Sequence, residues 1–210
     1  MRFLNRVDAG RQLARRLTAH AGRSDVIVLA LPRGGVPVAA EIASTLTAPL
    51  DVFLVRKIGV PGHPELAMGA IAEGGVRVLH EHLIEELGIS RATVDQISSR
   101  ERLELDRRDR LYRGDRPAPV VRDRTVILVD DGLATGATME AAIAALREMK
   151  PARIIVAVPV GAMETCDRIG KLADEVVCLS TPTFFNAVGQ WYEDFSETSD
   201  RDVRDLLAPS

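Results

Sequence analysis

The sequence predicts an α/β fold: a doubly wound, mainly parallel sheet flanked by helices. Short apolar runs typical of buried strands alternate with stretches in which apolar residues recur every three or four positions, as in helices packed on a sheet. This alternation favours parallel pairing, because each helix returns the chain to the same end of the sheet. At 210 residues the chain is long enough to bury a sizeable core, and we expect one domain.

The first part of the chain is predicted to contain a helix, a strand, a second helix and a second strand. Asp8 is expected to cap the first helix. Residues 26–31 form an apolar strand, and Pro37 lies where the first turn of the next helix tolerates proline. The second strand is expected over residues 50–55. The apolar stripe of the second helix consists of Val38, Ile42 and Leu46.

The middle of the chain differs in composition from the rest. Residues 56–75 contain five glycines and two prolines, which indicates a mobile excursion, and we expect a flexible lid loop over 57–75. A short strand over 76–79 is expected to return the chain to the body. Residues 90–113 form a long polar helix whose charges alternate in sign, so it is a solvated face or a contact in a homodimer.

The last part of the chain continues the alternation and then changes character. Strands are expected at 126–129, 154–158 and 176–179, with a helix after each of the first two. Most of the aromatic residues lie in 181–195. Ser199 and Asp202 form a capping box for a final short helix.

Composition and charge exclude several classes of function. The net charge of −3 does not favour a general nucleic-acid or membrane-surface binder. Two cysteines, Cys166 and Cys178, do not make a disulfide framework and are expected to pack in the core. No apolar run approaches the length of a membrane span, and the N-terminus has no signal-peptide core, so we expect a cytoplasmic protein.

Residues 125–138 (TVILVDDGLATGAT) carry the chemistry that organises the rest. A buried strand ends in two carboxylates, and a loop of small residues then leads into a helix. Ligands of open α/β sheets bind beyond the carboxyl ends of strands, and amides at a helix N-terminus favour an anion. Two carboxylates would repel a bare triphosphate but accept hydrogen bonds from sugar hydroxyls. The motif therefore predicts a phosphorylated sugar as ligand, the alternative being an ordinary capped strand–loop–helix.

Residues 129–138 resemble the phosphoribosyl pyrophosphate (PRPP) motif of type I phosphoribosyltransferases. By that resemblance, Asp130 and Asp131 hold the ribose hydroxyls. The 5′-phosphate would be held by Ala134, Thr135, Gly136, Ala137 and Thr138. The resemblance implies Mg²⁺ as cofactor, carried mainly by pyrophosphate and ribose oxygens, with Asp130 and Asp131 as indirect ligands through PRPP. It spans roughly residues 24–195 and implies a small hood formed by segments 1–22 and 181–210.

Two further loops resemble pyrophosphate-binding parts of this family. Arg33 and Gly34 follow the first strand and are similar to the pyrophosphate loop, although a plain strand–helix turn would also carry such residues. Arg56 and Lys57 end the second strand and look like the Arg-Lys pair of adenine and orotate phosphoribosyltransferases. Two surface cations are the alternative reading of that pair.

The acid/base group and the base-binding residues are less well defined. Glu73 is similar to the glutamate assigned to proton transfer in adenine phosphoribosyltransferases, but the neighbouring tyrosine of those enzymes is absent, and an exposed loop glutamate fits equally. Phe184 and Phe185 loosely resemble the base-stacking hood of hypoxanthine-type enzymes; the alternative is a small satellite core that includes Trp191. Ala134 stands where those enzymes carry an aspartate, so the two resemblances point to different bases.

The expected function is Mg²⁺-dependent transfer of the phosphoribosyl group of PRPP to a nucleobase-like acceptor, as in nucleotide salvage. A nucleoside 5′-monophosphate and pyrophosphate would be the products. The alternatives are a PRPP-sensing regulatory or binding protein without turnover and a sugar-phosphate hydrolase that uses the same pocket.

Overall fold

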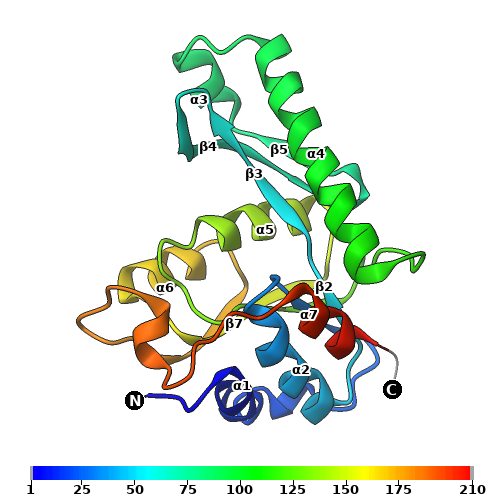
Figure 1. Cartoon of the computed structure of the whole chain (residues 1–210), viewed down its shortest axis with the longest axis vertical. Helices are drawn as coiled ribbons and strands as arrows, with labels where there is room; N and C mark the ends of the chain where they lie inside the picture. The colour runs from blue at the N-terminus through cyan, green and yellow to red at the C-terminus, as the bar shows by residue number, and fades with distance from the viewer. Residues whose placement is uncertain (1, 209–210) are drawn as a thin grey trace.

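The structure is a computed structural model that describes residues 2–208, apart from the side chain of Glu65, and its core is a parallel sheet of five strands (Figure 1). The strand order is β2-β1-β6-β7-β8, with every neighbouring pair parallel. This confirms the doubly wound α/β prediction. The strands are β1 (Val26–Ala30), β2 (Leu50–Val52), β6 (Thr125–Val129), β7 (Arg153–Val160) and β8 (Glu175–Ser180).

Helices cover both faces of this sheet, because alternate residues of each strand point to opposite faces. Val28, Ala30 and Ile127 face a core shared with one set of helices. Ile27 and Leu29 face the other core. The first face is covered by α1 (Arg6–Ala14), α2 (Gly35–Leu46) and α7 (Asp200–Leu207), and the second by α5 (Ala137–Glu148) and α6 (Met163–Gly170).

The chain runs from β1 to β2 on one side and from β6 to β7 and β8 on the other. The direction of winding therefore changes between β1 and β6, which are neighbours paired from Val26↔Thr125 to Ala30↔Val129. Crevices of this kind, at the carboxyl ends of two such strands, bind ligands in open α/β sheets. The two loops that the sequence singles out start at these two strand ends.

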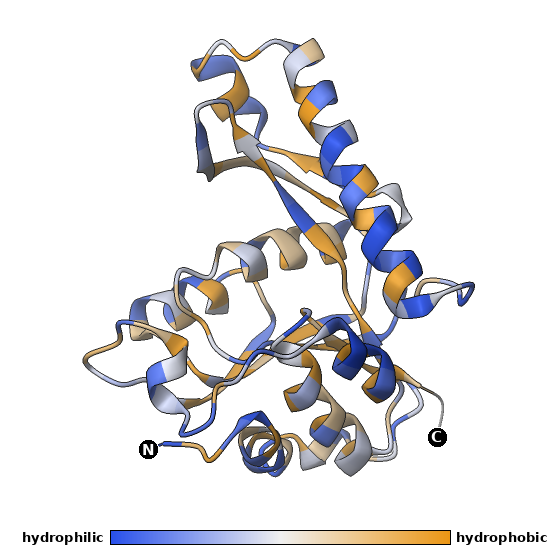
Figure 2. Ribbon diagram, viewed as in Figure 1, coloured by the Kyte–Doolittle hydropathy of each residue, from blue (hydrophilic) through white to orange (hydrophobic). Residues whose placement is uncertain are grey.

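A second, antiparallel sheet projects from the body, with the long helix α4 beside it (Figure 1). It consists of β3 (Val55–Val60), β4 (His63–Ala72) and β5 (Arg77–Leu79), followed by α3 (Glu81–Glu86) and α4 (Arg91–Arg113). The hydropathy colouring shows polar and apolar residues alternating along α4, as expected for a helix with one packed side (Figure 2). None of the helices described here could cross a lipid bilayer.

The segment predicted as a mobile excursion forms a β-hairpin of β3 and β4. Its glycines serve close packing: a Cβ on Gly59 would lie 2.7 Å from the Pro64 carbonyl oxygen, and one on Gly69 would lie 2.4 Å from that of Val78. Gly62, in the turn, has φ of +80°, which favours glycine. A role of residues 57–75 as a lid stays a prediction.

Two boundary predictions were wrong in detail. Asn5 caps α1 by accepting a hydrogen bond from the Asp8 amide at 2.9 Å, whereas Asp8 accepts one from the Leu4 amide. The second strand ends at Val52, and Val55 already begins β3. The capping box of Ser199 and Asp202 at α7 is confirmed.

The segments predicted to form a hood lie together. Residue Phe3 bridges to Tyr192, and their side chains are buried in a small cluster with Ala9 and Val160. The rings of Phe3 and Tyr192 are 5.5 Å apart. Phe185 and Trp191 pack against this cluster, as the satellite-core reading expects.

Candidate functional site

The loops after β1 and β6 are in direct contact. A Cβ on Gly34 would lie 2.0 Å from Oδ2 of Asp131, and one on Gly35 would lie 2.7 Å from the Val129 carbonyl oxygen. The Leu31 amide donates to that same carbonyl at 2.9 Å. Any side chain at position 34 would collide with the carboxylate, so the two loops form one site only because glycine stands there.

The acidic pair lies at the edge of this contact, half-buried. Asp130 accepts a hydrogen bond from the Asp131 amide at 2.8 Å, and Asp131 accepts one from Nε of Arg6 at 2.8 Å. Burial raises the pKa of Asp130, and the neighbouring Asp131 carboxylate raises it further. Burial also raises the pKa of Asp131, while Arg6 opposes that rise. Two adjacent carboxylates of this kind can accept hydrogen bonds from a pair of hydroxyls.

The loop that leads into α5 has the properties of an anion cradle. Ala134, Thr135 and Thr138 are exposed, and the first-turn amides of α5 lack helical partners by geometry. The outer side of the loop is anchored: Thr165 donates to the Ala134 carbonyl at 2.7 Å, and Arg168 donates to the Thr135 carbonyl. A Cβ on Gly136, whose φ is +76°, would lie 2.6 Å from Thr165, so glycine is required there.

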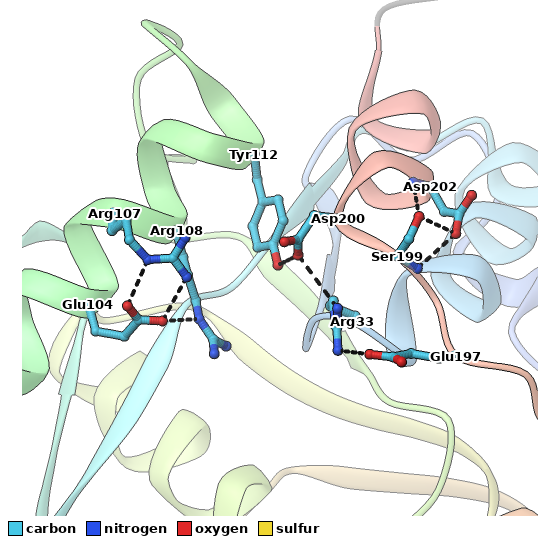
Figure 3. A network of polar contacts seen from close by, with 9 residues as sticks. All are labelled: Arg33, Glu104, Arg107, Arg108, Tyr112, Glu197, Ser199, Asp200 and Asp202. Carbon is cyan, nitrogen blue, oxygen red and sulfur yellow. Dashed lines mark hydrogen bonds and ion pairs between the residues drawn. The ribbon is translucent and has the colours of Figure 1, made fainter.

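Arg33, the predicted pyrophosphate ligand, is paired with the C-terminal segment. Its guanidinium contacts Glu197 and lies 3.9 Å from Asp200 (Figure 3). Asp200 also accepts a hydrogen bond from the Tyr112 hydroxyl of α4 at 2.6 Å. This cluster thus joins the β1 loop, α4 and the start of α7.

The sequence reasoning missed the residues that hold Asp131. Arg6, besides its bond to Asp131, donates to the Ser196 carbonyl at 2.7 Å and stacks on the Phe195 ring, 3.9 Å from its centroid. The Tyr192 hydroxyl donates to the Asp131 carbonyl at 2.6 Å. No local motif identifies Arg6 or Tyr192, because each lies more than 60 residues from Asp131 in the chain.

Arg56 and Lys57 line a cleft that adjoins both loops. The cleft has a volume of about 720 Å³ and lies between the β3–β4 hairpin, α4 and the first turns of α5. Pro32 of the β1 loop and Thr138 of the β6 loop also line it. Arg56 donates two hydrogen bonds to Glu101, at 2.8 and 2.6 Å. The structure therefore places this pair in one cleft with Thr138, a predicted phosphate ligand, although the pair lies on β3 and not at the end of β2.

Glu73 lies elsewhere. Its side chain is 2% exposed and accepts a hydrogen bond from Arg113 at 2.7 Å, and Arg113 also pairs with Asp51 and Asp109. Burial raises the pKa of Glu73 to about 7, against the lowering effect of Arg113. Glu73 does not line the cleft, and its burial corrects the alternative of an exposed loop glutamate. The geometry gives no support to a role in proton transfer.

The predicted base-stacking residues also lie away from the cleft. Phe184 is 85% exposed, and Phe185 packs against the Phe3 and Tyr192 cluster. Neither lines the cleft. Phe195, which stacks with Tyr192 at 5.0 Å and carries Arg6 on its face, lies closer to the acidic pair.

Within residues 2–208, no group of three or more His, Cys, Asp or Glu side chains could hold a metal ion. The carboxylate oxygens of Asp130 and Asp131 are the hard donors that Mg²⁺ prefers. They fit an ion whose remaining ligands come from a bound sugar phosphate and water.

A family model for the phosphoribosyl transferase domain matches residues 3–195. Two Mycobacterium tuberculosis sequences, MT0597 of strain CDC 1551 / Oshkosh and Rv0571c of strain H37Rv, are 48% identical to this chain over 201 residues. Both are provisionally named phosphoribosyl transferases. The matches cover 96% of this chain but 45% of each relative, so the chain spans less than half the length of the curated relatives it matches.

Among solved structures, TT1426 from Thermus thermophilus superposes with a TM-score of 0.90 at 45% identity, covering 99% of this chain and 98% of that one. A Neisseria gonorrhoeae protein solved with bound ppGpp has a TM-score of 0.51 at 13% identity, covering 99% of this chain and 97% of its own. The second similarity shows a shared fold only.

Proposed function

Because this chain belongs to the phosphoribosyltransferase family, we propose that it transfers the phosphoribosyl group of PRPP to a nitrogenous base. The observation that carries the proposal is the contact between Gly34 and Asp131. It brings a candidate pyrophosphate loop, a candidate diol-binding acid and a candidate phosphate cradle to one edge of the sheet.

In this proposal, each part of the site holds one part of PRPP. Asp130 and Asp131 accept hydrogen bonds from the ribose hydroxyls, and the amides of residues 134–138 hold the 5′-phosphate. Arg33, the Gly34 amide, Arg56 and Lys57 receive the pyrophosphate. Mg²⁺, when bound, neutralises part of the pyrophosphate charge.

The chain's own contribution to the reaction is positioning and charge stabilisation. A base nitrogen attacks C1 of the ribose while the bond from C1 to the pyrophosphate oxygen breaks, which inverts the configuration at C1. Negative charge develops on the leaving pyrophosphate, where Arg56 and Lys57 stabilise it. The proton that the attacking nitrogen loses passes to water or to the pyrophosphate, because Glu73 is buried in an ion pair.

The experiment is a pyrophosphate-release assay with PRPP, MgCl₂ and a panel of nucleobases. We expect release with at least one base and a decrease of about tenfold or more in kcat/KM for PRPP in Asp131→Asn, since a charge-assisted hydrogen bond contributes about 1.5–3 kcal/mol. Unchanged kinetics in that variant would count against the proposed ribose site.

A PRPP-binding regulator without turnover is the second candidate. The burial of Glu73 favours it, because an ion-paired glutamate outside the cleft leaves the site without an evident acid/base group. Such a protein would bind PRPP in calorimetry and release no pyrophosphate with any base. Release of phosphate from PRPP without a base would identify a hydrolase.

A further inference from the structure

The cleft beside the phosphate loops is strongly cationic. Its charged lining residues are Arg56, Lys57, Arg100 and Arg108, and Glu101 is the one carboxylate among the lining residues that the structure describes. Of these four cations, the proposed function assigns only Arg56 and Lys57 to the pyrophosphate. Arg100 and Arg108 belong to α4, a helix to which the family resemblance assigns no role.

The two α4 arginines lie at different depths in the cleft. They are eight residues apart, which corresponds to about 12 Å along a helix. Arg108 also lies beside Leu31, Pro32 and Thr138, next to the phosphate loops. Arg100 lies about two turns nearer the N-terminus of α4 than Arg108, and its side chain is 76% exposed.

The carboxylates beside the two α4 arginines do not neutralise them. Glu101 is shared between Arg56 and Arg100. Figure 3 shows Glu104 shared between Arg107 and Arg108 in the same way. The two guanidiniums beside Glu104 lower its pKa to about 2, so it stays ionised at neutral pH. Each carboxylate faces two arginines, so each of these two groups keeps a net positive charge.

The rest of the lining does not resemble a site for a neutral planar base. None of the described lining residues is aromatic, and the apolar ones are aliphatic: Pro32, Val55, Val60, Pro61, Pro64, Ile97 and Ala141. Phe184 and Phe185, the expected stacking residues, are outside the cleft. A neutral base would find no aromatic side chain to stack on, and its binding would not use the charge of the extra arginines.

We infer that this cleft is the acceptor site and that the acceptor carries an anionic group, a carboxylate or a phosphate, which Arg100 and Arg108 receive. The inference rests on the proposed transferase function and specifies its substrate class. The aliphatic walls contact the body of the acceptor, and the guanidiniums bind its anionic group through charge-assisted hydrogen bonds.

The test compares acceptors that differ in one charge, and it has a readout independent of turnover. Nicotinate and nicotinamide form one pair, and orotate and uracil form another. Binding of each compound is measured by calorimetry, with inorganic phosphate as a competitor that distinguishes a phosphate site from a carboxylate site. Pyrophosphate release from PRPP with MgCl₂ is measured in parallel.

We expect at least one anionic member to bind about tenfold more tightly than its neutral partner, or phosphate to bind with an affinity that falls when Arg100 and Arg108 are replaced. The double variant Arg100→Gln/Arg108→Gln should abolish that preference and change the KM for PRPP less than about twofold. Arg110→Gln, an exposed arginine of the same helix that does not line the cleft, is the matched control.

Equal binding of charged and neutral members, or a preference that survives in the double variant, would overturn the inference even if turnover is found. A preference for the anion without any pyrophosphate release would support the anion site and overturn the transferase proposal instead. Tighter binding of a neutral member would also overturn the inference.

Discussion

Replacing Gly34 with alanine tests whether the loops of β1 and β6 form one site. The alanine Cβ would lie 2.0 Å from Oδ2 and 2.7 Å from Cγ of Asp131, where ordinary contacts begin at 3.4 Å. The carboxylate or the loop must therefore move by about 1.4 Å. Such a movement disrupts the 2.8 Å bond from Arg6 to Asp131, whose side chains are 12% and 15% exposed.

The size of the effect follows from that bond. A charge-assisted hydrogen bond with a largely buried partner contributes about 1.5–3 kcal/mol. We expect Gly34→Ala to lower the free energy of unfolding by about 1–3 kcal/mol, since part of the bond's contribution is recovered by rearrangement. A displaced Asp131 carboxylate also loses its proposed hydrogen bond to a ribose hydroxyl, and a loss of about 1.5–3 kcal/mol raises the Kd for PRPP by about tenfold or more.

The assay combines urea unfolding with calorimetric titration of PRPP in MgCl₂. Gly170→Ala is the matched control, because its new Cβ would approach nothing closer than Val176 at 4.0 Å. If Gly34→Ala binds PRPP as tightly as the wild type and unfolds at the same urea concentration, the contact between the loops is not as described.

Three other predictions follow from the ion pairs. Glu197→Gln should lower the Kd for PRPP about two- to fivefold, because Arg33 then binds the pyrophosphate without first breaking an exposed ion pair, which contributes about 0.2–1 kcal/mol. Replacement of the exposed Glu193 by Gln is the control and should leave the Kd unchanged. Arg113→Met should reduce the free energy of unfolding in urea by about 3–5 kcal/mol, since three carboxylates lose their shared buried cation; a cost below about 1 kcal/mol would contradict this. The pKa of Glu73 in the folded state, about 7, lies above its reference value of 4.5, so the folded state gains stability as the pH falls from about 7 to 4.5. Urea midpoints measured across this pH range should change less steeply with pH in Glu73→Gln than in the wild type. Equal slopes in the two proteins would argue against the raised pKa.

The central elements were predictable because their signals are local. Val38, Ile42 and Leu46 of α2 recur at helical spacing and are all fully buried. Residues 126–129 form a strand with no exposed side chain. In both cases the buried positions must be apolar, so the spacing of apolar residues in the sequence indicates the type of element.

The β3–β4 hairpin was misread because glycine has two uses. A glycine-rich run is expected both in a mobile loop and where two strands approach closely. What decides between these readings is the close approach of the Pro64 backbone to Gly59 and of the Val78 backbone to Gly69, and such contacts are visible only once the strands are paired.

The sequence could indicate the candidate site only where that site consists of contiguous loops. The 129–138 motif holds its own strand, loop and helix start. The side chains that pair with the two loops come from distant segments: Arg6 lies 125 residues from Asp131, and Glu197 lies 164 residues from Arg33. Likewise, the burial of Glu73 depends on Arg113, 40 residues later, and no local pattern predicts that pair.

A crystal structure of the chain with PRPP and Mg²⁺ would test the account most directly. We expect the ribose 2′- and 3′-hydroxyls within hydrogen-bonding distance of Asp130 and Asp131, with the 5′-phosphate on the amides of residues 134–138. A sugar phosphate bound at another edge of the sheet, or a phosphate held away from the start of α5, would contradict it.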